Sequence, residues 1–345
     1  MVSKGKSHGL VLFLDMSGSM SSIFKETIDQ LLVLTEFCKK ANIPFEAYGF
    51  ADCYNHFPEG DSDLYTKVKH FFRASSKKFT MITDAPAWGE MRECTKFHLK
   101  HLIGTTLPRS QFKRAMDMLM IMATFYNGRY NDASINARLP YGLNFDRSGM
   151  ELSGTPFEEM LLSSREIIQK FKYNNALDIV SVIHLTDGQG STSMHCRNKS
   201  ERYLSDFTTL KDGSRAENTF YFIDNKTKVK VRRSTRNTQA TLTELVGAVT
   251  GCKHIGYYLC SSPGYSENAS EAKKLWNDHG YLTKKELGYH KYFYLKTNIQ
   301  RSNKDEFIVQ DGMTARKMAK LFGQAQNKKL RGRKMVSDLA GEIAV

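Results

Sequence analysis

Cysteine is scarce and scattered in this sequence. The 345 residues contain six cysteines, and no two of them form a C-x-x-C pair. This excludes a scaffold built on disulfides and argues against a zinc ribbon, and it favours reduced thiols in a cytosol. We therefore expect a cytoplasmic protein.

Long apolar runs are also missing. The longest run of aliphatic and aromatic residues covers positions 10–14, far short of the ~20 residues that a membrane span needs. No charged and apolar leader precedes this run, so we expect neither secretion nor membrane insertion.

Acidic residues are too few to balance the basic ones. The 50 Lys and Arg residues against 36 Asp and Glu residues give a net charge of +14. This surplus favours an acidic partner, either nucleic acid or the acidic face of another protein. The 41% of hydrophobic and 25% of charged residues suffice for a sizeable core and exclude disorder over most of the length.

What the sequence does contain is an alternation of buried strands and amphipathic helices. Strands are predicted at residues 9–15, 45–50, 79–83, 178–186, 254–260 and 291–297. Helices are predicted at residues 21–40, 110–126, 155–171, 241–249, 269–278 and 314–324. This order predicts an α/β fold with a doubly wound, mostly parallel sheet flanked by helices.

The predicted domain covers residues 1–300. Two stretches without a clear alternation, residues 53–150 and 190–236, are expected to be large insertions. Residues 301–345 are expected to form a C-terminal helix and a basic tail. No internal repeat divides the chain further.

Oxygen-bearing side chains follow the first predicted strand. The run Asp15-Met16-Ser17-Gly18-Ser19 offers one carboxylate and two hydroxyls directly before a helix. In open α/β sheets, ligands bind at the carboxyl ends of the strands. Oxygen ligands without nitrogen or sulfur suit a hard cation such as Mg²⁺.

This D-x-S-x-S run resembles the metal-ion-dependent adhesion site of von Willebrand factor A domains. Two further motifs match that family in the same order, Ser153-Gly154-Thr155-Pro156 and Leu185-Thr186-Asp187-Gly188. The resemblance implies a von Willebrand A or Rossmann-like fold and a bound Mg²⁺, with Mn²⁺ or Ca²⁺ as alternatives. It implies that Ser17 and Ser19 ligate the metal directly, that Thr155 does so directly or through water, and that Asp15 and Asp187 orient waters and hydroxyls around them.

An alternative hypothesis is that these side chains only cap helices. Asp and Ser are good N-cap residues, so Asp15, Ser17 and Ser19 could serve the helix that follows them. Thr155 is likewise a candidate N-cap, with Pro156 at the first helical position. Capping alone does not explain why two aspartates and three hydroxyls come from distant segments.

Within the family, the chain is most similar to the smaller von Willebrand A subunit of aerobic cobaltochelatase and its relatives in large tailed phages. Those relatives imply a AAA+ ATPase partner, in the host cytoplasm for a phage protein. The resemblance predicts a non-catalytic, Mg²⁺-dependent module that binds an acidic residue of its partner. Direct participation in metal insertion into a tetrapyrrole is a third, enzymatic hypothesis, and the resemblance assigns ring binding to a larger subunit.

A basic hairpin predicted at residues 219–231 supports the other hypothesis, nucleic-acid binding. Alternating lysines on its second strand would track a phosphate backbone, although exposed charges are often only a solvated edge. The candidate residues are Lys228, Lys230, Arg232 and Arg233. His98 and His101, three residues apart on a candidate helix, lack a third ligand and are not expected to bind a metal.

Overall fold

A computed structural model shows the fold of this chain. It describes residues 7–52, 91–93, 97–126, 152, 154–188, 190, 194–196, 207–209, 215–217, 221–232, 238–260, 273–274, 276–278, 280–286 and 288–296. The strand predicted at residues 79–83, the helix predicted at residues 314–324 and the basic tail lie outside these residues.

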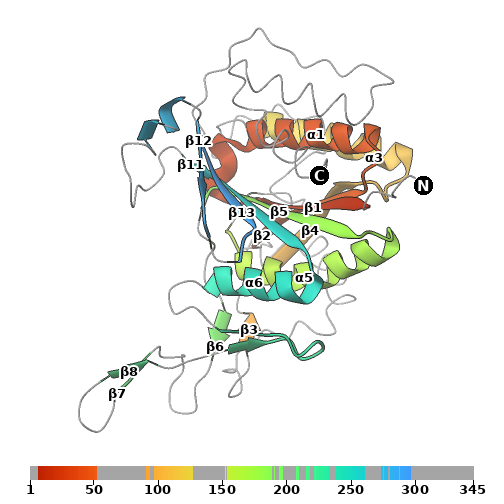
Figure 1. The fold of residues 1–345 in the computed structure, drawn as a ribbon. Coiled ribbons are helices and arrows are strands. Elements are labelled where there is room, and N and C mark those ends of the chain that lie inside the picture. The colour runs from red at the N-terminus through yellow and green to blue at the C-terminus, as the bar shows by residue number, and fades with distance from the viewer. Residues whose placement is uncertain are drawn as a thin grey trace, which may run out of the picture.

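A seven-stranded sheet forms the centre of the molecule (Figure 1). Its strands are His8–Asp15 (β1), Phe45–Asp52 (β2), Phe97–Gly104 (β4), Ile179–Thr186 (β5), Lys253–Cys260 (β11), Tyr281–Lys284 (β12) and Lys291–Lys296 (β13). Their order across the sheet is β12-β13-β11-β5-β1-β2-β4. The five inner strands are parallel, and the two edge strands β4 and β12 are antiparallel to their neighbours.

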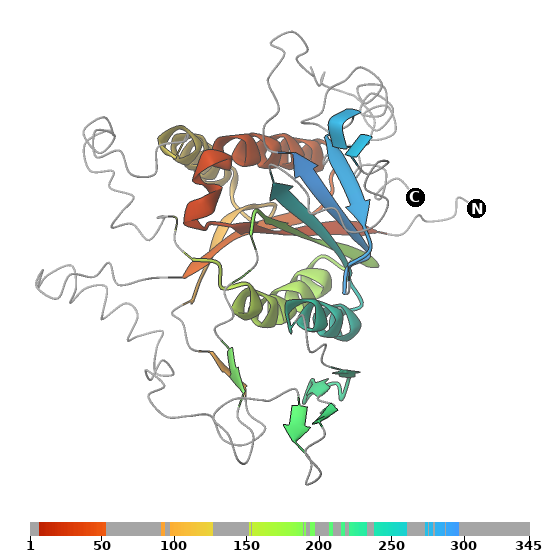
Figure 2. The same ribbon diagram turned by 90° about the vertical axis from the view of Figure 1, so that its left-hand side faces the viewer.

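Helices cover both faces of this sheet (Figures 1 and 2). Phe24–Lys40 (α1) and Arg109–Phe125 (α3) lie on one face, and Phe157–Asn174 (α5) and Thr238–Thr250 (α6) lie on the other. The structure therefore confirms an α/β fold with a mostly parallel sheet between two layers of helices. No helix in the described part of the chain is long and apolar enough to cross a membrane.

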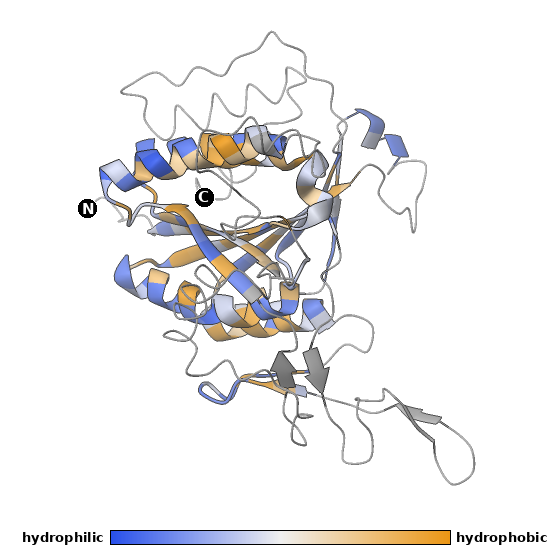
Figure 3. Ribbon diagram, turned by 180° about the vertical axis from the view of Figure 1, so that it is seen from behind, coloured by the Kyte–Doolittle hydropathy of each residue, from blue (hydrophilic) through white to orange (hydrophobic). Residues whose placement is uncertain are grey.

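The unbroken apolar run of β1 follows from this layered arrangement. Leu10, Leu12 and Leu14 point into the core under α1 and α3, while Val11 and Phe13 point into the core under α5 and α6. A strand covered on both faces needs apolar residues at every position, because successive side chains alternate between the faces. Figure 3 shows the hydrophobic residues along these central strands.

The segment between β1 and α1 differs slightly from the prediction. The helix predicted from residue 21 begins instead as the 3-10 turn Gly18–Ser22 (η1), and α1 follows from Phe24. At its other end Asn42 has a φ of 55°, a left-handed conformation that Asn tolerates better than most residues and that ends the helix.

Two edge elements were not predicted correctly. The candidate helix carrying His98 and His101 is wrong, because these residues lie in strand β4, where His101 pairs with Tyr48 of β2. Strand β12 was not predicted at all. Both β4 and α3 lie within residues 53–150, so part of this predicted insertion belongs to the main sheet and its helical layer.

Short strand pairs accompany the main sheet. They are Met91–Glu93 (β3) with Met194–Cys196 (β6), Phe207–Thr209 (β7) with Arg215–Glu217 (β8), and Tyr221–Ile223 (β9) with Lys230–Arg232 (β10). The last pair is the predicted basic hairpin. Of the helix predicted at residues 269–278, the structure describes residues 273, 274 and 276–278, all helical.

Candidate metal site

The carboxyl ends of β1 and β5 lie side by side in the middle of the sheet. Leu14 of β1 pairs with Leu185 of β5, so Asp15 and Thr186 follow at the same edge. The chain continues from β1 to β2 on one side, while β5 lies on the other side. Such a switch point is where α/β sheets bind ligands.

Hydrogen bonds join five residues at this edge. Asp15 Oδ1 accepts the backbone N–H of Ser17 at 2.8 Å, and Asp15 Oδ2 accepts the hydroxyl of Thr186 at 2.7 Å. The hydroxyl oxygens of Ser17 and Ser19 are 2.9 Å apart, and Ser19 donates to Asp187 Oδ1 at 2.8 Å. Because the Ser19 proton goes to Asp187, Ser17 must be the donor in the serine pair.

The two carboxyl groups of this cluster have raised pKa values. Burial of Asp15 raises its pKa to about 7, and repulsion from Asp187 adds to the rise while hydrogen bonds from Thr186 and Ser17 oppose it. Burial also raises the pKa of Asp187. Both shifts disfavour the carboxylate, and a nearby cation would reverse them.

The donor atoms fit a hard divalent cation. Two carboxyl groups and three hydroxyls supply oxygen only, which matches Mg²⁺, Mn²⁺ or Ca²⁺ better than zinc or copper. Within the described residues, no three or more His, Cys, Asp or Glu side chains cluster so that they could hold a metal. The serine hydroxyls offer further oxygen ligands at this edge.

Helix capping accounts for only part of these contacts. Ser17 occupies the position before η1 in an extended conformation, but its hydroxyl makes no capping hydrogen bond. That hydroxyl instead contacts Ser19, which in turn contacts Asp187, 168 residues away in the chain. The backbone N–H of Ser17 bonded to Asp15 is the one local contact of the kind that capping predicts.

The packing of the residues around Thr155 places it at the carboxyl edge of the sheet. The prediction that Thr155 is the N-cap is wrong, because Pro156 occupies that position and α5 begins at Phe157. The ring of Phe157 packs 5.8 Å from that of Phe50, the β2 residue paired with Asp15. A Cβ on Gly190, three residues after Asp187, would lie 3.2 Å from the Thr155 carbonyl oxygen.

Thr186 was not predicted to have a role of its own. This residue is buried and its hydroxyl binds Asp15, so it joins the β5 end of the cluster to the β1 end. The signal was present in the sequence, since a second oxygen-bearing side chain stands directly before Asp187 at the end of a predicted strand.

The candidate nucleic-acid residues lie on the β9–β10 hairpin. Lys228, Lys230 and Arg232 are exposed, and Arg233 lies outside the described residues. The predicted row of lysines along one strand is wrong, because Lys226 and Lys228 belong to the turn and the strand begins at Lys230. The turn bends sharply at Lys228, which has a φ of 61°.

Comparisons with known proteins do not assign the chain to a family. No protein-family model and no curated protein matches it. The pilus adhesin SpaC from Lactobacillus rhamnosus GG, in its open conformation, shares 13% identity at a TM-score of 0.35 over 84% of this chain and 28% of that chain. The human COPII-coat protein Sec24c shares 9% identity at a TM-score of 0.29 over 75% of this chain and 27% of that chain. This chain thus spans little more than a quarter of those proteins, and likenesses this weak do not bear on its function.

Proposed function

We propose that this protein is a Mg²⁺-dependent interaction module of the von Willebrand A kind that binds a carboxylate of a partner protein. One observation carries the proposal: Asp15, Ser17 and Ser19 meet Thr186 and Asp187 through hydrogen bonds at the switch point of the sheet. Segments 168 residues apart converge there on oxygen donors alone. The sequence motifs that resemble a metal-ion-dependent adhesion site support the same assignment.

In this proposal Ser17 and Ser19 hold the ion, and Thr155 completes the set directly or through water. Asp15 and Asp187 accept hydrogen bonds that fix the orientation of the serines. The bound ion would supply an electrophilic centre with exchangeable waters, suited to an incoming Asp or Glu carboxylate. In this proposal these residues bind the ion and the partner, and we assign the chain no catalytic role.

The partner class comes from the resemblance to cobaltochelatase-like subunits. We propose that the partner is a AAA+ ATPase and that the chain acts in a chelatase-like or remodelling complex. The positive net charge of +14 supports an acidic partner in general.

The test of the metal site compares Asp15→Asn with the wild type in thermal unfolding. We expect Mg²⁺ or Mn²⁺ to raise the midpoint of the wild type, because an ion that binds only the folded state stabilises it. Asp15→Asn should abolish this rise. Asparagine can still accept from Ser17, and Thr186 can turn its hydroxyl to the Gly188 carbonyl oxygen, 3.1 Å away.

This design separates loss of the metal from loss of the fold. The metal-free Asp15→Asn protein should be at least as stable as the wild type above pH 7, because it removes a buried charge that is costly there. Asp178→Asn is the matched control, since Asp178 precedes the opposite end of β5. A full Mg²⁺ response in Asp15→Asn, or none in the wild type, would refute the metal site.

A second candidate function is nucleic-acid binding by the β9–β10 hairpin. Its outer face exposes Lys230 and Arg232 beside Tyr221 and Ile223, and the Lys230 ammonium lies 3.8 Å from the centre of the Tyr221 ring. Basic and aromatic side chains together are suited to binding single-stranded nucleic acid, because the cations contact its phosphates and the rings stack on its bases. Salt-sensitive retention of RNA that Lys230→Gln and Arg232→Gln weaken would support this function, and its absence in the wild type would exclude it.

A further inference from the structure

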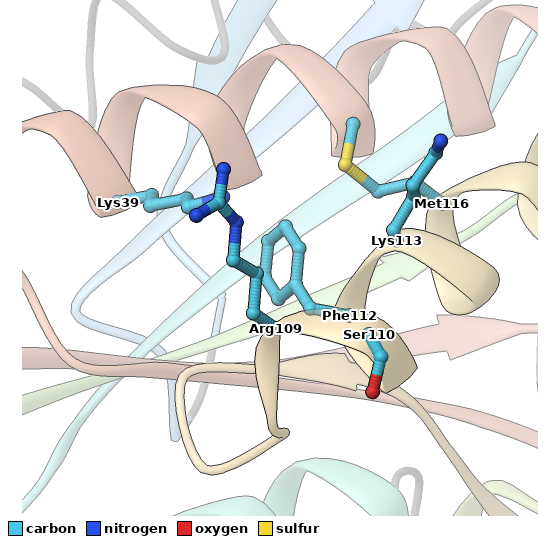
Figure 4. A pocket seen from close by; sticks show the side chains of 6 residues that line it. All are labelled: Lys39, Arg109, Ser110, Phe112, Lys113 and Met116. Atoms are coloured by element: carbon cyan, nitrogen blue, oxygen red, sulfur yellow. The ribbon is translucent and has the colours of Figure 1, made fainter.

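A pocket lies between α1 and α3, at the amino ends of the parallel strands (Figure 4). Strand β4 runs against those strands, so α3, which follows it, starts there. The Ser110 hydroxyl and the Lys113 ammonium point to opposite sides of the pocket in Figure 4, so its polar groups do not form a common site. The start of α6 lies at the other edge of the sheet, beside the candidate metal site.

The loop that carries Asp187 is held at both of its ends. At the first end, the hydroxyl of Thr186 in β5 accepts the Gly188 N–H at 3.2 Å. At the other end, the carbonyl oxygen of Gly190 accepts a hydrogen bond from Gln239 Nε2 at 2.9 Å. The sheet therefore fixes one end of this loop, and helix α6 fixes the other.

Gln239 lies in the first turn of α6, and two contacts hold this turn in place. The carbonyl oxygen of Gln239 accepts the Thr243 hydroxyl at 2.9 Å. Gly288 lies so close to the same turn that a Cβ there would be 2.5 Å from the carbonyl oxygen of Ala240. Only glycine allows this approach of one backbone to another. The Gln239 side chain thus projects from an anchored helix start.

Gly190 also contacts the start of α5. A Cβ on Gly190 would lie 2.4 Å from the Cβ of Phe157 and 2.5 Å from Gln239 Nε2, so no side chain fits between the two helices. The Phe157 N–H in turn donates to the carbonyl oxygen of Thr155 at 2.8 Å. Gly190 is therefore packed directly against the segment that carries Thr155.

Helix capping does not explain the side-chain contact of Gln239. A capping side chain accepts a hydrogen bond from an N–H of its own helix, whereas Gln239 Nε2 donates to a residue 49 positions away. This bond ties together the loop that carries Asp187, the segment that carries Thr155 and the start of α6. Groups that hold the segments around a metal site orient the ligands and so affect the affinity for the metal.

We propose that Gln239 is a positioning residue of the metal site. It holds the Asp187 loop against the start of α5, so that Asp187 and Thr155 keep the separation that the ion requires. Gly190 makes this arrangement possible, because it places no side chain between the two helices. The inference rests on the proposed function and extends the site to a residue of α6.

The test is isothermal titration of the whole chain with Mg²⁺, after bound metal has been removed with EDTA. Gln239→Met keeps the length of the side chain and removes the donor. We expect its Kd for Mg²⁺ to rise about fivefold, the change that corresponds to one neutral hydrogen bond. Gly190→Ala should weaken Mg²⁺ binding further, because its methyl group must displace the Cβ of Phe157 and with it the start of α5.

Thr250→Val is the matched control at the other end of the same helix. It removes a buried hydrogen bond of 2.7 Å from the Thr250 hydroxyl to the Val246 carbonyl oxygen. We expect it to lower the thermal midpoint of the metal-free protein and to bind Mg²⁺ as the wild type does. A loss of stability alone would therefore not reproduce the effect of Gln239→Met.

The positioning role is overturned if Gln239→Met or a folded Gly190→Ala protein binds Mg²⁺ as tightly as the wild type. It is also overturned if Thr250→Val weakens Mg²⁺ binding equally. These results would leave the metal site itself intact. Absence of Mg²⁺ binding by the wild type would instead refute the proposed function, and the positioning role with it.

Discussion

Thr186 joins the two strand ends that form the candidate metal site. Its hydroxyl donates to Asp15 Oδ2 at 2.7 Å, and both residues are buried. Because the same hydroxyl also accepts the Gly188 N–H at 3.2 Å, one side chain connects β1, β5 and the loop that carries Asp187. The position of Asp187 therefore depends on Thr186.

We predict that Thr186→Val lowers the free energy of unfolding by about 1–3 kcal/mol, because it leaves a buried carboxyl oxygen without its donor. The variant should also reduce the rise in midpoint that Mg²⁺ produces. Chemical denaturation with and without Mg²⁺ measures both effects. Thr186→Ser keeps the hydroxyl and should restore the Mg²⁺ response; failure of this rescue would mean that the methyl group, and not the hydrogen bond, matters.

Thr155 allows a separate test, because it does not cap α5. If it serves the metal site, Thr155→Ala should leave the midpoint of the metal-free protein within a few degrees of the wild type. Binding of the partner should weaken by about 2 kcal/mol, the scale of losing a charge-assisted contact. A large loss of stability with normal partner affinity would show a structural role instead.

Two charged contacts join the hairpin β9–β10 to α5, a half-buried one from Arg165 to Asp224 and an exposed one from Lys226 to Glu166 at 3.5 Å. Asp224 accepts hydrogen bonds from the N–H and hydroxyl of Thr227, and it pairs with Arg165 of α5 at 2.9 Å. The hydrogen bond from the Thr227 hydroxyl and the charge of Arg165 hold the pKa of Asp224 below its ordinary value. The stabilisation is therefore complete above the ordinary pKa of Asp and is lost as the pH falls through the lowered one.

We predict that Asp224→Asn loosens the hairpin without unfolding the sheet. Backbone amides of residues 221–232 should exchange with solvent several-fold faster, while those of α1 keep the wild-type rate. Hydrogen exchange read by mass spectrometry makes this comparison within one sample. Unchanged exchange in the hairpin would show that Phe222 and Val231, which are buried beneath it, suffice to hold it.

At the scale of the whole molecule, two buried histidines make the fold sensitive to acid. His184 Nε2 lies 3.4 Å from His254 Nδ1, and His184 Nδ1 lies 3.0 Å from the Tyr289 hydroxyl, all between the sheet and α6. Burial lowers the pKa of His254 to about 4, and burial together with His254 lowers that of His184. Both side chains are therefore neutral in the folded protein near pH 7.

Below pH 6.5 the unfolded chain binds a proton at His254 that the folded chain refuses until about pH 4. The free energy of unfolding must therefore decrease as the pH is lowered from 6.5 to 4. We predict that His254→Asn reduces the stability lost between pH 7.5 and pH 5 by about 2 kcal/mol. Urea denaturation at the two pH values gives this difference.

The wild type must be compared with His254→Asn because Asp15 changes the pH dependence of the stability in the opposite direction. Its pKa is raised to about 7, so the metal-free folded protein holds a proton there that the unfolded chain releases above about pH 4. This contribution weakens the fold as the pH rises. It is common to wild type and His254→Asn and cancels in their difference; an equal loss in both proteins would rule out the histidine effect.

The sequence alone determined the inner elements of this fold. The unbroken run of β1 and the helical spacing of α1 and α3 are local patterns, and each requires a definite kind of burial. The motifs of the candidate site were visible for the same reason, since Asp15 ends one predicted strand and Asp187 directly follows another. An α/β sheet places such residues at one edge whatever the rest of the chain does.

Only the tertiary structure decided the edges of the sheet and the contacts between distant segments. His98 and His101 were placed on a possible helix, whereas they lie in strand β4, which forms by pairing with β2. The bond from Thr186 to Asp15 joins residues 171 positions apart. No local pattern encodes such a contact, because it exists only once the strand order has made β1 and β5 neighbours.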